Sequence, residues 1–192
     1  MTESVLVTGS SRGIGRAIAL RLARAGHDIV LHCRSGLADA EAVKAEVEAL
    51  GRNARILQFD VSDRASCKAI LEADVETHGA YYGVVLNAGL TRDGAFPALS
   101  EEDWDLVMRT NLDGFYNVLH PVMMPMIRRR AAGRIVCITS VFRPDRQSRA
   151  SQLQRVQGRF DRRSQGVGDR TGQTQNHGQL CRTRPDRHGD AR

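Results

Sequence analysis

TGSSRGIG, residues 8–15, links a short apolar run at Ser4–Thr8 to a segment whose apolar residues recur at helical spacing, Gly13–Gly26. A glycine-rich turn between a strand and a helix lets the chain reverse tightly beside a parallel sheet. The stretch therefore predicts the first strand–turn–helix unit of an α/β domain.

The same alternation continues outward to residue 141. The pattern predicts further strands at Asp28–Cys33, Ala54–Asp60, Tyr82–Asn87 and Arg134–Ser140, and helices at Ala38–Leu50, Arg64–His78 and, as two stretches, Glu101–Arg130. Short strands separated by helices favour parallel βαβ units. We predict one α/β domain over residues 1–141, with a Rossmann-like, doubly wound parallel sheet of five strands in the order 3-2-1-4-5.

The glycines of residues 8–15 are suited to phosphate binding. Gly9 permits the sharp turn, while Gly13 and Gly15 let the backbone approach a pyrophosphate and let the helix pack on the sheet. The helix N-terminus adds free N–H groups and partial positive charge. The combination predicts a dinucleotide ligand, and a purely structural glycine-rich turn is the alternative.

The spacing Gly-x-x-x-Gly-x-Gly differs from the usual dinucleotide fingerprint and resembles that of the short-chain dehydrogenase/reductase family. Four more motifs resemble that family in the same order: Phe59–Val61, Leu86–Gly89, Thr110–Val118 and Gly133–Ser140. The resemblance covers residues 4–141 almost without a gap. It implies cofactor binding by residues of these motifs and of the second strand's end: Thr8, Gly9, Ser11, Arg12, Gly13, Ile14, Gly15, Arg34, Ser35, Asp60, Val61, Asn87, Ala88 and Gly89.

The end of the second predicted strand indicates which cofactor is bound. Proteins that bind NAD usually carry an acid there to hold the ribose 2′-hydroxyl. Residues 32–35 read His-Cys-Arg-Ser and contain no acid. Arg34, and Arg12 in the glycine turn, can bind a 2′-phosphate through charge-assisted hydrogen bonds, so we predict NADP(H).

Residues 86–96 and 110–121 most resemble the β-ketoacyl-acyl-carrier-protein reductases within the family. This likeness implies reduction of a 3-oxoacyl thioester, carried by acyl-carrier protein or CoA, in fatty acid biosynthesis. It also implies Ser140 and Asn111 as catalytic residues, a homotetramer for the intact form, and a cytoplasmic location.

Half of the implied catalytic set is absent. In the family a Tyr about thirteen residues after the Ser protonates the forming alkoxide, and a Lys four residues later lowers its pKa. The chain has Leu153 and Gln157 at those positions. Neither side chain can do this chemistry, so we expect the chain to be inactive. An atypical reductase using another phenol is the alternative, and the other tyrosines, Tyr81, Tyr82 and Tyr116, all precede Ser140.

Residues after Val141 are consistent with translation in a shifted reading frame. When the codons from Phe142 onward are regrouped one base later, the allowed residues include Ser-Gly-Leu-Ile-Gly-Asn-Arg-Gly and then Val-Asn-Tyr-Ser-Ala-Ser-Lys-Ala-Gly. The regrouped Tyr and Lys fall on positions 153 and 157, where the family places them. We infer one extra base near the codons of Val141 and Phe142.

Residues 142–192 differ in composition from the domain. Positions 143–192 hold twelve Arg, no Lys and five acids, so the net charge of +6 belongs to this tail. Its few apolar residues follow no period, so we predict disorder there. The strand at 134–140 should then form an uncovered edge that promotes aggregation.

A different class of function is a nucleotide-binding module whose basic tail binds nucleic acid or acidic partners. The composition of the tail speaks against nucleic acid, because Lys is absent and Phe160 is the only aromatic after Phe142.

No run of about 18 apolar residues is present, so we expect no membrane span. The N-terminus lacks the charged lead and long apolar stretch of a signal peptide. The cysteines are scattered, without CxxC pairs or metal-ligand spacing: Cys33, Cys67, Cys137 and Cys181. We expect free thiols in a reducing compartment and no metal site.

Overall fold

The computed structural model describes residues 3–92, 96–140 and 176–183, the last of these as backbone only. Its sheet is parallel throughout, with strand order β3-β2-β1-β4-β5-β6. The strands are β1 (Ser4–Val7), β2 (Asp28–Cys33), β3 (Ala54–Gln58), β4 (Gly83–Leu86), β5 (Gly133–Ser140) and β6 (Asn176–Thr183).

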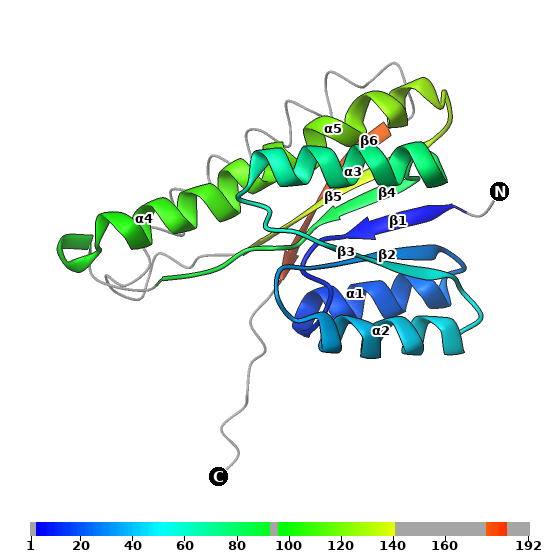
Figure 1. The fold of residues 1–192 in the computed structure, drawn as a ribbon, viewed down its shortest axis with the longest axis horizontal. Coiled ribbons are helices and arrows are strands. Elements are labelled where there is room, and N and C mark those ends of the chain that lie inside the picture. The colour runs from blue at the N-terminus through cyan, green and yellow to red at the C-terminus, as the bar shows by residue number, and fades with distance from the viewer. Residues whose placement is uncertain (1–2, 93–95, 141–175, 184–192) are drawn as a thin grey trace, which may run out of the picture.

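Helices cover both faces of the sheet (Figure 1). One face carries α1 (Gly13–Arg24) and α2 (Leu37–Ala49), and the other carries α3 (Arg64–His78) and α5 (Gly114–Arg128). A 3-10 turn (Phe96–Ala98), α4 (Glu101–Met108) and a π-helical turn (Arg109–Asp113) precede α5. The doubly wound fold and the order 3-2-1-4-5 of the first five strands are as predicted.

Alternation along the central strands creates two cores. Leu6, Val30 and Val84 face α3 and α5, whereas Val5 and Ile29 face α1 and α2. Because successive strand residues point to opposite faces, a strand covered on both faces must be apolar at almost every position. This explains why the central strands β1 and β4 read as continuous apolar runs, whereas the edge strand β3 also contains Arg55 and Gln58.

A partly buried ion pair joins β3, α3 and the segment before β4. The guanidinium of Arg55 donates two hydrogen bonds of 2.7 Å to the carboxylate of Asp74, and the hydroxyl of Tyr81 donates a third, also of 2.7 Å. Burial would raise the Asp74 pKa, but these hydrogen bonds and the charge of Arg55 lower it on balance. Asp74 is therefore a paired carboxylate in the folded chain.

The sixth strand corrects the prediction that β5 is an uncovered edge. Residues 176–183 pair with β5 in parallel over its whole length, from Gly133 opposite Asn176 to Ser140 opposite Thr183. Strand pairing uses backbone N–H and C=O groups, so an extended segment can pair with a free edge without an apolar pattern. The predicted lack of regular structure is therefore wrong for residues 176–183, and the other tail residues lie outside the described part of the chain.

Candidate functional site

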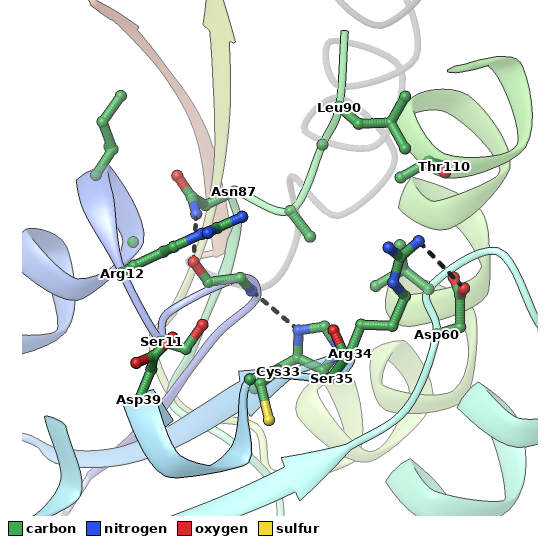
Figure 2. A pocket seen from close by; sticks show the side chains of 18 residues that line it. Ser11, Arg12, Cys33, Arg34, Ser35, Asp39, Asp60, Asn87, Leu90 and Thr110 are labelled. Atoms are coloured by element: carbon green, nitrogen blue, oxygen red, sulfur yellow. Dashed lines mark hydrogen bonds and ion pairs between the residues drawn. The ribbon is translucent and has the colours of Figure 1, made fainter. Parts of the chain in front are cut away.

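A cavity of about 450 Å³ lies beyond the carboxyl ends of β1, β2, β3 and β4. In a doubly wound sheet this edge, beside the strand where the order reverses, is where ligands bind. Of the fourteen predicted cofactor residues, all but Thr8 and Gly13 line the cavity. Figure 2 shows Ser11 and Arg12 on one side of it and Asp60 on the other. Segments from four strand ends thus meet around one space.

Thr8 is buried beneath the cavity and holds the turn after β4. Its hydroxyl oxygen accepts hydrogen bonds from the N–H groups of Asn87, at 2.9 Å, and Ala88, at 3.0 Å. It donates to the carbonyl of Val85 at 3.3 Å. Thr8 therefore shapes one wall from below, and its position gives it no direct contact with the open space.

The glycine turn is packed tightly against that wall. Asn87 donates from its side-chain amide to the carbonyls of Thr8, at 2.9 Å, and Gly9, at 3.1 Å. A β-carbon on Gly15 would lie 2.1 Å from the carbonyl oxygen of Gly9 and 2.5 Å from the Asn87 amide nitrogen. The backbone at Gly9 and Gly13 has φ of +64° and +56°, where glycine is favoured.

Two helices begin at the cavity without a side-chain cap. The residues that precede α1 and α2, Arg12 and Gly36, make no capping hydrogen bond, and both line the cavity. In contrast, Asp63 caps α3 and Ser100 caps α4. Uncapped first-turn N–H groups and the positive end of the helix dipole suit an anion. The residues present therefore fit the phosphates of a dinucleotide.

Arg34 lies beside Asp60 at the mouth of the cavity, 3.7 Å from Nη1 to Oδ2 (Figure 2). Burial raises the Asp60 pKa, but hydrogen bonds from the N–H and hydroxyl of Ser62, with the charge of Arg34, lower it overall. Asp60 is thus ionised at neutral pH, and a 2′-phosphate would compete with it for Arg34.

The structure describes the side chain of one predicted catalytic residue, Asn111, and only the backbone of the other, Ser140. Asn111 lies in the π-helical turn, a feature frequent at functional sites, and its amide bonds both backbone groups of Leu90, at 2.9 and 2.8 Å. Its side chain therefore fixes the segment after β4. Ser140 ends β5, where only its backbone is described. Leu153 and Gln157 lie outside the described residues.

Sequence reasoning missed several residues that line the cavity: His32, Cys33, Gly36, Asp39, Leu90 and Thr110. Asp39 is an acid in the first turn of α2, five residues after Arg34, so a search confined to the strand end does not find it. Thr110 directly precedes the predicted Asn111, but nothing in the spacing marks it. The three tyrosines considered as substitute proton donors do not line the cavity, and Tyr81 is buried against Asp74.

Other expectations concern thiols, metals and membranes. Cys33, Cys67 and Cys137 are free, as predicted, and they are also buried; the side chain of Cys181 lies outside the described part of the chain. Within the described ranges no group of three or more His, Cys, Asp or Glu side chains could hold a metal ion. In the same residues, no helix combines the length and apolarity that crossing a bilayer requires.

A parallel sheet, a glycine turn and a cavity at the switch point define a doubly wound α/β domain with the architecture of nucleotide-binding proteins. More closely, residues 3–150 match the family model "short chain dehydrogenase", and the chain belongs to that family. This agrees with the resemblance seen in its motifs.

Curated relatives refine the comparison. The chain is 75% identical over 141 residues to a 3-oxoacyl-[acyl-carrier-protein] reductase FabG of Aggregatibacter actinomycetemcomitans, covering 73% of this chain and 58% of that protein. A reductase of the same name from Staphylococcus aureus (strain Mu50) is 40% identical over 141 residues, covering 73% and 57% of the two chains. The chain thus spans less than two thirds of the length of these relatives.

Solved structures support the fold. A metagenomic short-chain oxidoreductase in complex with NADP superposes with a TM-score of 0.87 at 26% identity, covering 94% of this chain and 81% of that one. A short chain dehydrogenase from Burkholderia cenocepacia J2315, also in complex with NADP, gives 0.84 at 29% identity over 91% and 70%. Both are proteins of the same architecture with a nucleotide bound.

Proposed function

We propose that this chain is the NADP(H)-binding part of a reductase for 3-oxoacyl thioesters, carried by acyl-carrier protein or CoA, and that as translated it does not complete the reduction. The observation that carries the cofactor assignment is the cavity itself. It combines two uncapped helix N-termini with two guanidinium groups, those of Arg12 and Arg34. The 75% identity to a 3-oxoacyl-[acyl-carrier-protein] reductase supports the substrate class.

The cavity residues divide the binding of the dinucleotide between them. The first-turn N–H groups of α1 hold the pyrophosphate, and Gly9 and Gly15 keep side chains out of its way. Arg34, released from Asp60, pairs with the 2′-phosphate together with Arg12. By the family resemblance, Asp60 and Val61, which also line the cavity, would contact the adenine. When bound, NADPH supplies the hydride that the reduction requires.

Protonation is the step for which the chain lacks residues. The carbonyl oxygen of the substrate needs a hydrogen-bond donor, and Ser140, at the end of β5, is the residue we propose for that role. The developing alkoxide then needs a proton, and positions 153 and 157 hold Leu and Gln. Loss of a general acid costs roughly 10²- to 10⁴-fold, and loss of the coupled pair costs more. We attribute both losses to one extra base near the codons of Val141 and Phe142.

The test compares two forms of the protein. One is the 192-residue chain, and the other is expressed after removal of one base at the Val141–Phe142 codons. We expect both to bind NADPH in a fluorescence titration, and the restored form alone to oxidise NADPH with acetoacetyl-CoA and to assemble as a tetramer. Turnover by the 192-residue chain would disprove the assignment of the missing Tyr and Lys. Absence of NADPH binding, with DNA binding that weakens steeply with salt, would instead favour the basic-tail module.

A further inference from the structure

His32 connects two walls of the cavity through its imidazole. The ring lies at the end of β2 and is buried, with 2% of the residue exposed. Its Nδ1 lies 2.9 Å from the backbone nitrogen of Gly9, and its Nε2 lies 3.0 Å from the carbonyl oxygen of Phe59. Gly9 belongs to the glycine turn, and Phe59 directly precedes Asp60. One side chain therefore contacts the backbone leaving β1 and the backbone leaving β3.

The partners fix the protonation state of the ring. An N–H group can only donate, so Nδ1 must accept from Gly9 and carries no proton. A carbonyl can only accept, so Nε2 must carry the proton that it donates to Phe59. A charged imidazolium has a proton on both nitrogens and could not accept from Gly9. The geometry thus requires the neutral ring with its proton on Nε2.

The peptide groups on either side of Gly9 are held from opposite directions. The N–H of Gly9 is bound by His32, and its carbonyl is bound by the Asn87 amide. The φ of Gly9, +64°, directs the turn toward the start of α1. A rotation of this backbone would move the Gly9 carbonyl, against which Gly15 is packed, and with it the first turn of α1.

We propose that His32 is a positioning residue of the cofactor site, which sets the orientation of the Gly9 backbone through its neutral Nε2–H form. This inference rests on the proposed binding of NADP(H). His32 touches the cofactor-binding loop, and its effect on affinity passes through Gly9. Its own backbone also anchors the loop, since its N–H donates to the Ser10 hydroxyl and its carbonyl accepts from the Ser10 N–H. Side-chain substitutions leave those two bonds in place.

Two substitutions separate the contacts of the ring. In His32→Asn the side-chain oxygen can occupy the place of Nδ1 and accept from Gly9, whereas the bond to Phe59 is lost. In His32→Gln the longer amide can reach the place of Nε2 and donate to Phe59, whereas Gly9 loses its acceptor. Both variants remove one neutral hydrogen bond. We therefore expect the two variants to have similar stability. They differ in whether the N–H of Gly9 keeps its acceptor.

Three measurements on the full-length chain test the proposal. Nitrogen-15 NMR of the unsubstituted protein reads the tautomer of His32. Amide hydrogen exchange reads the protection of the Gly9 N–H. NADPH titration reads affinity, with the melting temperature of each variant as the control for general stability. We expect the Nε2–H form, faster exchange at Gly9 in His32→Gln than in His32→Asn, and roughly tenfold weaker NADPH binding in His32→Gln alone.

The outcomes distinguish this inference from the proposed function. A proton on Nδ1 in the unsubstituted chain overturns the positioning role, even if neither variant folds. Equal NADPH affinities of the two variants, or losses of affinity that follow the melting temperature alone, overturn it as well. His32 would then be a structural histidine of the core. If the unsubstituted chain binds no NADPH, the proposed cofactor fails, and exchange at Gly9 in the two variants still decides whether His32 positions the turn.

Discussion

Gly15 packs against the carbonyl oxygen of Gly9 so closely that a β-carbon on Gly15 would lie 2.1 Å from that oxygen. The two glycines are six residues apart: Gly9 lies in the turn after β1, and Gly15 lies in the first turn of α1. Their contact closes the turn and brings the first N–H groups of α1 over the end of the sheet. Backbone lies on both sides of the contact, so neither partner can move aside cheaply.

We predict from this contact that Gly15→Ala destabilises the chain by about 3 kcal/mol, because an added methyl group overpacks a site bounded by backbone. Gly13→Ala is the matched control, since a β-carbon there meets nothing within 4 Å. Its cost is the left-handed backbone alone, about 1–2 kcal/mol. Urea denaturation of the ligand-free variants measures both. Equal destabilisation would show that the Gly9–Gly15 contact is not the tight one described.

Arg34 provides a test of cofactor preference. If its guanidinium binds the 2′-phosphate, Arg34→Ala should weaken NADPH binding by about 10- to 100-fold, the value of a charge-assisted hydrogen bond. NADH, which lacks that phosphate, should bind almost unchanged. Arg92→Ala removes the same charge at a position that does not line the cavity. Parallel titrations with both cofactors check the prediction, and an equal loss for NADH would contradict it.

The ion pair of Asp74 predicts a large effect on stability and none on binding. Asp74→Asn leaves the largely buried Arg55 with a neutral partner, so we expect the free energy of unfolding to fall by about 3 kcal/mol. Tyr81→Phe removes one hydrogen bond and retains the ring and the ion pair, with an expected loss of about 1 kcal/mol. Urea denaturation measures the difference. If the two losses are alike, the ion pair contributes little beyond the Tyr81 hydrogen bond.

Burial lowers the pKa of His32 to about 4, although the hydrogen bond to the Phe59 carbonyl and the negative charge of Asp60 act to raise it. Its unfolded value is 6.5, so between these values the unfolded chain binds more protons. The stability from the neutral ring is complete above pH 6.5 and is lost as pH falls toward 4, in total about 3 kcal/mol. His32→Asn removes this titration. Unfolding free energies at several pH values should therefore fall less steeply for the variant, and parallel curves would refute the prediction.

Much of the fold could be predicted because its signals are local. Strand Asp28–Cys33 and helix Arg64–His78 have in the structure the bounds that the pattern predicts. A strand buried on both faces is encoded by a short apolar run. The start of α3 is likewise encoded locally, because the Asp63 carboxylate accepts hydrogen bonds from the N–H groups of Ala65 and Ser66. The long segment Glu101–Arg130 was predicted as two helical stretches and is divided by the π-helical turn at Arg109–Asp113.

The site was predictable where residues are contiguous along the chain. Residues 8–15 and 86–89 form motifs, and the structure brings their cavity-lining members together. The ligand of these residues is proposed from the motifs and the cavity taken together. The absence of Tyr and Lys at positions 153 and 157 is likewise visible in the sequence alone, and the shift in reading frame that we infer from it stays a prediction.

The amino-acid sequence by itself determined the order of strands and helices, the glycine turn and the presence of Leu and Gln at positions 153 and 157, where the family has Tyr and Lys. Only the tertiary structure decided that His32 joins Gly9 to Phe59, that Asn111 is bonded to Leu90, and that residues 176–183 pair with β5. The physical reason is the separation of the residues along the chain. Periodicity reflects interactions within one segment, whereas these contacts join residues more than twenty positions apart. Strand order and the presence of a free backbone edge determine which of these distant residues meet.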